Sequence, residues 1–237
     1  LMDNTIIVFM SDNGMPFPRC KGTLYDSGIQ TPLLFMWKGK ITPGTTHSNG
    51  MVSSIDLAPT LLDLAGIDIP QDMYGRGFKK LLFDPTQKGS EFIYAERNWH
   101  DADEYMRCIR SSKYKLVYNA YYNIPHGTSM DISDSWYELK RLQRSNKLTE
   151  NMKQIFQCPR AMVEIYDLEK DPYELNNVAD LPEYREIGEK LAAKLVKWQK
   201  DTQDHPWWKR PYIRISSFQK STTYVDRLNF TDYHIFI

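Results

Sequence analysis

The chain has 237 residues, of which 41% are hydrophobic, so it can bury a core in one large domain or two smaller ones. Its 30 basic and 30 acidic side chains give a formal charge of zero, which argues against a nucleic-acid partner or a strongly anionic membrane surface. The apolar runs have the length of strands and are too short to cross a membrane. We therefore expect a globular protein without a transmembrane segment.

The chain enters an apolar run, Thr5 to Met10, almost at once, with no signal peptide before it. β-branched and aromatic residues without alternation are typical of a buried strand in an α/β sheet. Because a chain rarely starts inside its own core, we expect that residues upstream have been removed. A short N-terminal strand is the alternative.

Residues 1–88 are predicted to form a first unit, of the α/β class. Strands are expected at Thr5–Ser11 and Pro32–Trp37, and the loop between them is long for a hairpin, which marks it as a candidate functional loop. Capping residues precede a helix expected from Asp56 to Ala65. The Pro- and Gly-punctuated stretch from Ile67 to Gly89 predicts a connection leading away from this unit.

Residues 89–237 are predicted to form a small α+β domain with an antiparallel sheet, a long helix and a tail. The expected strands are Glu91–Ala95, Met106–Arg110, Tyr114–Tyr118 and Val163–Leu168. The expected helices are Asp134–Arg144, Thr149–Phe156 and an amphipathic helix from about Glu183 to Asp201. The aromatic and basic tail from Pro206 onward has no clear periodicity, so it is given no place in the fold.

The tetrapeptide Ser11-Asp12-Asn13-Gly14 follows the first predicted strand. Ligands of open α/β sheets bind at this carboxyl edge. Asp12 and Asn13 offer a carboxylate and an amide oxygen, which suit Ca²⁺ or Mg²⁺ better than a soft metal. Asp-Asn-Gly is also an ordinary tight turn, so this motif alone leaves both interpretations open.

A second motif, K-G-T-x-Y-D-x-G, runs from Lys21 to Gly28 before the next predicted strand. The order of strand, D-N-G, this motif and the helix segment Ser54–Gly66 resembles the sulfatase family of the alkaline phosphatase superfamily. The resemblance implies that Asp12 and Asn13 bind Ca²⁺ and that Lys21 contacts the sulfate group of the substrate.

Other segments resemble the N-sulfoglucosamine sulfohydrolases, or sulfamidases, within that family. They are Ser11–Pro18, Glu164–Pro172 with Glu174 and Asn176-Asn177, and Lys197–Trp207. Animal sulfamidases carry arginine at the position of Lys21, whereas O-sulfatases usually carry lysine. A lysine is a point charge and an arginine a planar fork, so N-sulfate and O-sulfate substrates both remain open.

The nucleophile of sulfatases is a formylglycine made from Cys or Ser in a C/S-x-P/A-x-R motif, which this sequence lacks. Cys158-Pro159-Arg160 has the wrong spacing, so we interpret Cys158 as structural, and Cys20 and Cys108 also lack the motif. The aspartate pair that completes the family's calcium site is absent as well. The resemblance therefore implies a C-terminal fragment, inactive alone, whose nucleophile and N-terminal half lie upstream. It also implies that residues 1–88 are the later part of a large mixed or parallel-sheet α/β domain.

His100 follows a predicted strand at a place where the resembling enzymes often have a sugar-contacting residue, and an exposed loop histidine is an equal alternative. Arg107 and Arg110 alternate on a strand with Met106 and Ile109, which favours a solvated strand face; contact of one of them with an acidic sugar is the alternative. For Trp198, core packing is a better interpretation than a sugar-stacking platform.

The resemblance implies hydrolysis of sulfate ester or N-sulfate groups on a sugar, such as one derived from a glycosaminoglycan, in a periplasmic, secreted or lysosomal protein. One alternative is a phosphodiesterase or phosphonate hydrolase of the same superfamily, which would place a His-rich, two-zinc site at this sheet edge. The other is a non-catalytic carbohydrate-binding module, for which no metal dependence is expected.

Overall fold

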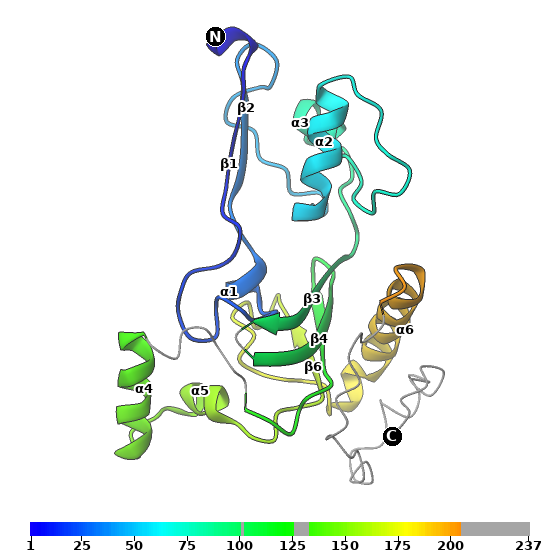
Figure 1. The fold of residues 1–237 in the computed structure, drawn as a ribbon. Coiled ribbons are helices and arrows are strands. Elements are labelled where there is room, and N and C mark those ends of the chain that lie inside the picture. The colour runs from blue at the N-terminus through cyan, green and yellow to red at the C-terminus, as the bar shows by residue number, and fades with distance from the viewer. Residues whose placement is uncertain (101, 126–132, 205–237) are drawn as a thin grey trace.

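The computed structural model describes residues 1–100, 102–125 and 133–204. The described chain has two separate sheets, a two-stranded one in the order β1-β2 and a four-stranded one in the order β3-β4-β5-β6 (Figure 1). The smaller sheet rises away from the larger one, and the N-terminus lies at its far end. Within the described residues, no helix is long and apolar enough to span a membrane.

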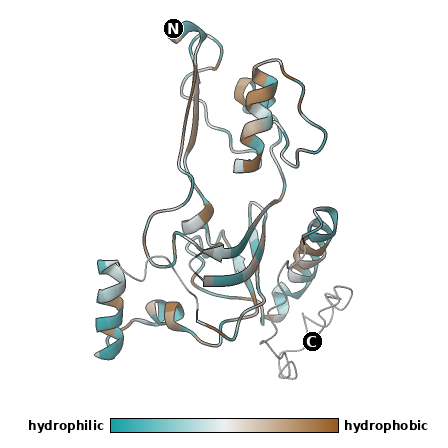
Figure 2. Ribbon diagram, viewed as in Figure 1, coloured by the Kyte–Doolittle hydropathy of each residue, from teal (hydrophilic) through white to brown (hydrophobic). Residues whose placement is uncertain are grey.

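The two-stranded sheet pairs β1 (Ile6–Met10) with β2 (Leu33–Trp37) in antiparallel register. Burial alternates along both strands, and Figure 2 shows hydrophobic residues along both. One face packs on the following segment, where the ring centroids of Phe35 and Phe78 lie 5.6 Å apart. The opposite face is exposed and consists of Ile7, Phe9, Leu34 and Met36. Of the larger mixed or parallel sheet that the sequence predicts, the described chain holds this antiparallel pair.

The predicted helix after β2 is confirmed as α2 (Leu57–Leu64), which follows a 3-10 turn at Ser54–Asp56. The Asp56 carboxylate accepts the backbone N–H of Ser53 at 2.9 Å, which satisfies a free donor at the helix start. Gly66 has a φ of 73°, as expected of a C′ glycine.

A helix that the sequence did not predict, α3 (Lys79–Phe83), lies in the stretch expected to be a connection. It packs beside α2, and a buried hydrogen bond of 2.9 Å from the backbone N–H of Phe78 to Oγ1 of Thr60 joins the two. A five-residue helix is too short to show periodicity, so its tertiary contacts rather than its sequence pattern define it.

The four-stranded sheet is antiparallel throughout and consists of β3 (Ile93–His100), β4 (Ala102–Arg110), β5 (Tyr114–Asn119) and β6 (Val163–Asp167). The turn between β4 and β5 is closed by a 2.8 Å hydrogen bond from the backbone N–H of Ser111 to the carbonyl of Tyr114. β3 continues past its predicted end at Ala95, and β4 starts before its predicted start at Met106, because the two strands pair as a long hairpin.

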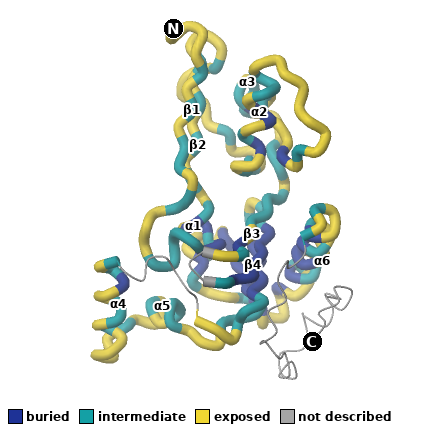
Figure 3. Tube along the Cα trace, viewed as in Figure 1, coloured by how far each residue is buried: buried dark blue, intermediate teal, exposed yellow. Residues whose placement is uncertain are grey.

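The long helix α6 (Arg185–Asp201) covers one face of this sheet, after a 3-10 turn at Pro182–Tyr184. Ile109 and Leu116 from the sheet meet Leu191 and Leu195 from the helix in the main core. Trp198 stacks on Tyr94 with ring centroids 5.0 Å apart, which confirms its interpretation as a packing residue. Figure 3 shows the buried residues concentrated in this sheet and on the facing side of α6.

The other face of the sheet holds Met106, Cys108 and Val117, which pack against Leu24 from the segment between β1 and β2. That segment contains one short helix, α1 (Asp26–Ile29). The loop that the sequence marks as functional therefore lies against the face of the sheet that α6 does not cover.

The remaining described helices are α4 (Asp134–Arg144), whose bounds agree with the prediction, and α5 (Glu150–Lys153). The latter continues into a 3-10 turn at Gln154–Phe156, and another such turn, Met2–Asn4, opens the chain. The predicted small α+β unit with an antiparallel sheet and a long helix is thus confirmed. The tail from Pro206 lies outside the described residues.

Candidate functional site

Asp12 and Asn13 lie just beyond the end of β1, and the Asp12 side chain is exposed. After them, the backbone N–H of Gly14 donates to the carbonyl of Gly28 at 2.8 Å. A Cβ at Gly14 would lie 1.9 Å from the carbonyl oxygen of Ser27, so this approach requires glycine. The segment from Gly14 to Gly28, here called the Lys21 loop, is therefore closed at its base beside the Asp12-Asn13 turn.

The backbone around Lys21 is held on both sides of that residue. Its own N–H donates to the carbonyl of Met15 at 3.1 Å, which keeps it close to the turn. The carbonyl of Cys20 accepts hydrogen bonds from the backbone N–H and Oγ1 of Thr23 at 3.1 and 2.8 Å. The carbonyl of Gly22 accepts one from the guanidinium of Arg97 on β3. The second sheet thus contacts the loop that carries Lys21.

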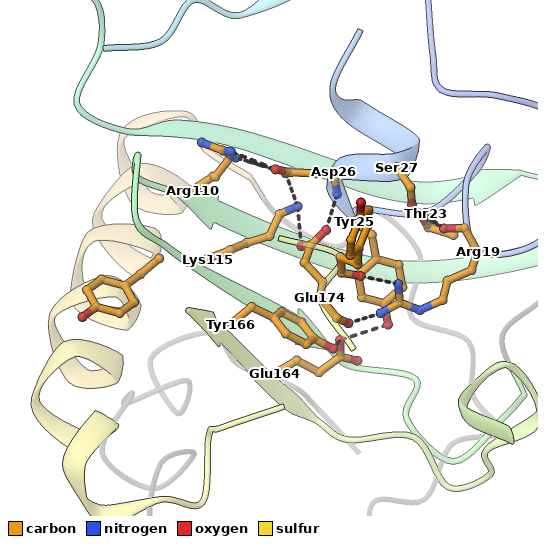
Figure 4. Close-up of polar contacts among 12 residues, drawn as sticks. Arg19, Thr23, Tyr25, Asp26, Ser27, Arg110, Lys115, Glu164, Tyr166 and Glu174 are labelled. Atoms are coloured by element: carbon orange, nitrogen blue, oxygen red, sulfur yellow. Dashed lines mark hydrogen bonds and ion pairs between the residues drawn. The ribbon is translucent and has the colours of Figure 1, made fainter. Parts of the chain in front are cut away.

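A buried cluster of two acids and two bases fastens this loop to the sheet (Figure 4). Asp26 at the start of α1 forms ion pairs of 2.8 Å with Arg110 on β4 and 2.7 Å with Lys115 on β5. Lys115 is fully buried and also lies 2.7 Å from Oε1 of Glu174. Each of the two acids and each of the two bases has an oppositely charged partner, which is the condition for burying charged groups.

The two carboxyl groups of this cluster respond differently to burial. For Asp26, burial works against ionisation, but hydrogen bonds from Arg110 and Lys115 outweigh it and hold its pKa below the usual value. For Glu174, burial is the largest influence and raises the pKa despite the neighbouring Lys115.

A second polar group lies next to the cluster, around the carboxylate of Glu164 on β6 (Figure 4). It accepts hydrogen bonds from the hydroxyls of Tyr25 and Tyr166 at 3.0 and 2.8 Å and from the Asn119 amide at 2.7 Å. Burial, and then the Glu164 charge, raise the pKa of both tyrosines, so they remain neutral donors. A hollow of about 170 Å³ lies here, and neither Asp12, Asn13 nor Lys21 lines it.

The oxygen donors of Asp12 and Asn13 have the chemistry that a hard divalent cation needs. Neither side chain has a hydrogen-bond partner within the described ranges, so both are available. Ca²⁺ takes about six to eight oxygen ligands, and the same ranges contain no group of three or more His, Cys, Asp or Glu side chains placed to hold a metal. The pair fits part of a calcium site, and further ligands are needed to complete it.

His100 is the last residue of β3 rather than a loop residue after it, and its side chain lies outside the described part of the structure. Backbone contacts bring Lys21 close to the Asp12-Asn13 turn. The loop that carries Lys21 also contacts β3 through Arg97, which lies three positions before His100. The role of each predicted site residue remains a prediction.

The prediction of a solvated face for Arg107 and Arg110 is wrong. Arg107 is 1% exposed because Asp204 binds its guanidinium through two hydrogen bonds of 2.5 and 2.6 Å, and Arg110 binds Asp26. The two arginines face opposite sides of the sheet, and each finds an acid from a distant segment. The alternation along a strand shows which side chains share a face of the sheet. It does not show which segment from elsewhere in the chain packs on that face and supplies an acidic partner.

Sequence reasoning also missed the cluster of Asp26, Arg110, Lys115 and Glu174 as a unit. Two of its members stood in motifs that the sequence singled out, Asp26 in K-G-T-x-Y-D-x-G and Glu174 after Asp171-Pro172. No spacing links these motifs, because 148 positions separate Asp26 from Glu174.

This architecture, a four-stranded antiparallel sheet with one long helix and a loop from a second sheet on its other face, is that of the C-terminal portion of sulfatases. The family described as N-sulphoglucosamine sulphohydrolase, C-terminal, matches residues 20–158. The chain belongs to this family, and the resemblance inferred from its motifs is confirmed.

Two relatives show how far the likeness extends. An ulvan-active sulfatase of Formosa agariphila is 33% identical over 204 residues, which cover 84% of this chain and 33% of the relative. The human N-sulphoglucosamine sulphohydrolase is 28% identical over 221 residues, covering 87% of this chain and 43% of the relative. The chain therefore spans about a third to two fifths of the length of these relatives.

Solved structures agree with this. A protein in complex with its substrate D-glucosamine-2-N,6-O-disulfate matches with a TM-score of 0.63 and 25% identity, over 88% of this chain and 37% of that one. A phosphonate monoester hydrolase from Silicibacter pomeroyi matches with a TM-score of 0.56 and 19% identity, over 86% of this chain and 36% of that one. At that identity the second likeness shows the shared fold alone.

Proposed function

We propose that this chain supplies part of the active site of a calcium-dependent sulfatase that hydrolyses sulfate ester or N-sulfate groups on sugars, including sugars derived from glycosaminoglycans. The observation that carries the proposal is the closure of the Lys21 loop beside the Asp12-Asn13 turn, through the 3.1 Å contact of Lys21 with Met15 and the 2.8 Å contact of Gly14 with Gly28. Membership of the sulphohydrolase family supports it.

In this proposal Lys21 holds a sulfonyl oxygen of the substrate and neutralises the charge that develops there as the leaving group departs. Asp12 and Asn13 would hold part of the coordination of a calcium ion, which when bound would supply further stabilisation of negative charge. The nucleophile, a formylglycine in the family's chemistry, would come from a polypeptide segment that this sequence does not contain. The His100 side chain, at the end of β3, would contact the sugar.

A partner polypeptide segment is part of the proposal. The exposed face of β1 and β2, made of Ile7, Phe9, Leu34 and Met36, is a contiguous apolar surface on adjacent strands. Apolar faces of this kind mark contact surfaces. We place the remainder of the sulfatase domain on it, so that residues 1–88 complete that domain and residues 89–237 form the smaller C-terminal one. An exported location, periplasmic, secreted or lysosomal, belongs to the same proposal.

The test is an assay of the full-length protein that carries this chain on an aryl sulfate, on N-sulfoglucosamine and on a phosphonate monoester. We expect sulfate release that is lost on chelation and restored by Ca²⁺, and that is lost when Asp12 is replaced in Asp12→Ala. Asp72→Ala, in the loop between α2 and α3, is the matched control and should retain activity. Preferred turnover of the phosphonate, or activation by zinc alone, would instead assign the protein to the phosphonate hydrolase branch.

A further inference from the structure

Glu174 lies far from Lys21 in the sequence, yet it contacts the chain on both sides of that lysine (Figure 4). It is 1% exposed, and its backbone has a φ of 56°, in the left-handed region that residues other than glycine rarely adopt. Such backbone strain persists only where the surroundings hold it in place, and it is concentrated at functional sites.

The carboxylate of Glu174 holds the part of the loop that follows Lys21 in the sequence. Its Oε2 accepts the backbone N–H of Asp26 at 2.5 Å, five positions after Lys21. Its Oε1 lies 2.7 Å from Nζ of Lys115, which in turn binds the Asp26 carboxylate at 2.7 Å. The backbone N–H of Asp26 is thus bound by Glu174, and its carboxylate is bound by Lys115, the ion-pair partner of Glu174.

The backbone of Glu174 holds the part of the loop that precedes Lys21. Its carbonyl accepts a hydrogen bond from the guanidinium of Arg19, two positions before Lys21, and the carbonyl of Tyr173 accepts another at 3.1 Å. Arg19 also lies over the ring of Tyr25, 3.8 Å from its centroid. Arg19 itself has a φ of 62°, so both partners of this contact are held in left-handed conformations.

Side-chain hydrogen bonds within the loop also connect its two ends and fix the backbone next to Lys21. Oγ of Ser27 donates to the carbonyl of Arg19 at 2.6 Å, and Oγ1 of Thr23 donates to the carbonyl of Cys20 at 2.8 Å. Displacing either Arg19 or Asp26 would therefore move the backbone on which Lys21 stands. A side chain that stabilises charge in a reaction must be held within about 0.5 Å of its productive place.

We propose that Glu174 is a positioning residue for Lys21, holding both flanks of the Lys21 loop on the C-terminal sheet so that the ammonium group meets the sulfonyl oxygens. The inference rests on the proposed function for the role of Lys21, but the attachment of the loop to Glu174 can be measured without any activity.

Cys20 provides that measurement, because it is half-buried and directly precedes Lys21. In a Cys158→Ser background, which removes the exposed thiol, the alkylation rate of native Cys20 relative to its rate in urea reports opening of the loop. We expect Glu174→Gln to raise this ratio about tenfold or more. Arg19→Gln, which leaves the buried charges untouched, should raise it as well.

Asp204→Asn is the matched control. It also removes a carboxylate from a salt bridge with a buried partner, Arg107, but on the face of the sheet covered by α6. It should leave the Cys20 ratio within about twofold of the parent. Unchanged ratios in both Glu174→Gln and Arg19→Gln, or an equal rise in Asp204→Asn, would overturn the attachment.

A double-mutant cycle in the full-length enzyme tests whether Glu174 acts through Lys21. Glu174→Gln should lower kcat more than it raises KM, and this loss of kcat should shrink to about twofold or less when Lys21 is already alanine. An equal loss of kcat in both backgrounds would show a purely structural role and refute the inference. Failure of the proposed function would look different, since the unmodified enzyme would then release no sulfate while the Cys20 ratios still report the loop.

Discussion

The backbone N–H of Gly14 donates to the carbonyl of Gly28 over 2.8 Å, so that the turn after β1 and the end of the Lys21 loop are joined. Two positions that the sequence separates by a Pro-rich loop thus form one support for Asp12, Asn13 and Lys21.

Gly14→Ala should destabilise the chain and loosen the Lys21 loop. The added Cβ would meet the backbone oxygen of Ser27 at 1.9 Å, and backbone cannot move aside cheaply. We expect a loss of about 1 to 3 kcal/mol in urea denaturation. Gly77→Ala is the control, because its Cβ would make ordinary contacts at 3.4 Å and beyond. Equal stability of the two variants would contradict the close approach.

Asp26→Asn should lower stability most near neutral pH. The folded-state pKa of Asp26 is held below its usual value, so its charge contributes stability above the unfolded pKa of about 3.9. That contribution is lost as the pH falls through the lower folded pKa. Breaking a buried pair costs about 3 to 5 kcal/mol at pH 7, and the difference between Asp26→Asn and the parent should shrink below about pH 4.

Urea denaturation at several pH values measures this difference. Glu186→Gln, which removes one member of an exposed pair with Lys190, should change stability little at any pH. A constant difference between Asp26→Asn and the parent from pH 7 to pH 3 would show that the Asp26 charge does not contribute.

The three cysteines should react in a fixed order at pH 8. Cys158 is exposed and Cys20 half-buried, whereas Cys108 is 1% exposed and burial raises its pKa to about 11. Alkylation of the native protein followed by peptide mass spectrometry should therefore label Cys158 first, Cys20 more slowly and Cys108 only in urea. Early labelling of Cys108 would mean that the sheet opens easily.

The exposed apolar face of β1 and β2 should make the separately expressed chain associate. Phe9 is 63% and Leu34 56% exposed, and the two residues pair across the strands. The double variant Phe9→Thr, Leu34→Thr keeps β-forming residues but removes apolar surface, so it should be less associated in analytical ultracentrifugation. Tyr137→Gln removes an exposed aromatic from α4 and should have no such effect. An unaltered size distribution in the double variant would argue against this face as a contact surface.

Lys21→Ala in the full-length enzyme should lower turnover by about ten- to a thousand-fold, the loss expected when one charge-stabilising donor is removed. Substrate binding should change less, because the charge develops mainly in the transition state. Lys88→Ala, an exposed lysine before the second sheet, should leave kcat unaltered. Steady-state kinetics that do not separate the two variants would remove Lys21 from the mechanism.

The sequence by itself was sufficient to identify the family, to place α2 and to predict the antiparallel sheet and long helix of the second unit. Local patterns carry this information: a capped apolar face predicts α2, short runs rich in β-branched and aromatic residues predict the strands, and ordered motifs around Asp12 and Lys21 predict the site. These signals arise within a few positions of one another, so a single sequence displays them.

Only the tertiary structure decided which distant residues hold that site. Glu174 reaches Asp26 across 148 positions, and Arg110 finds the same carboxylate instead of solvent. No periodicity encodes such pairings, because a strand pattern specifies which face a side chain takes but not which other segment will cover that face. Burial decides the rest: once the sheet excludes water, Lys115 must meet acids, and the loop that carries Lys21 supplies one of them.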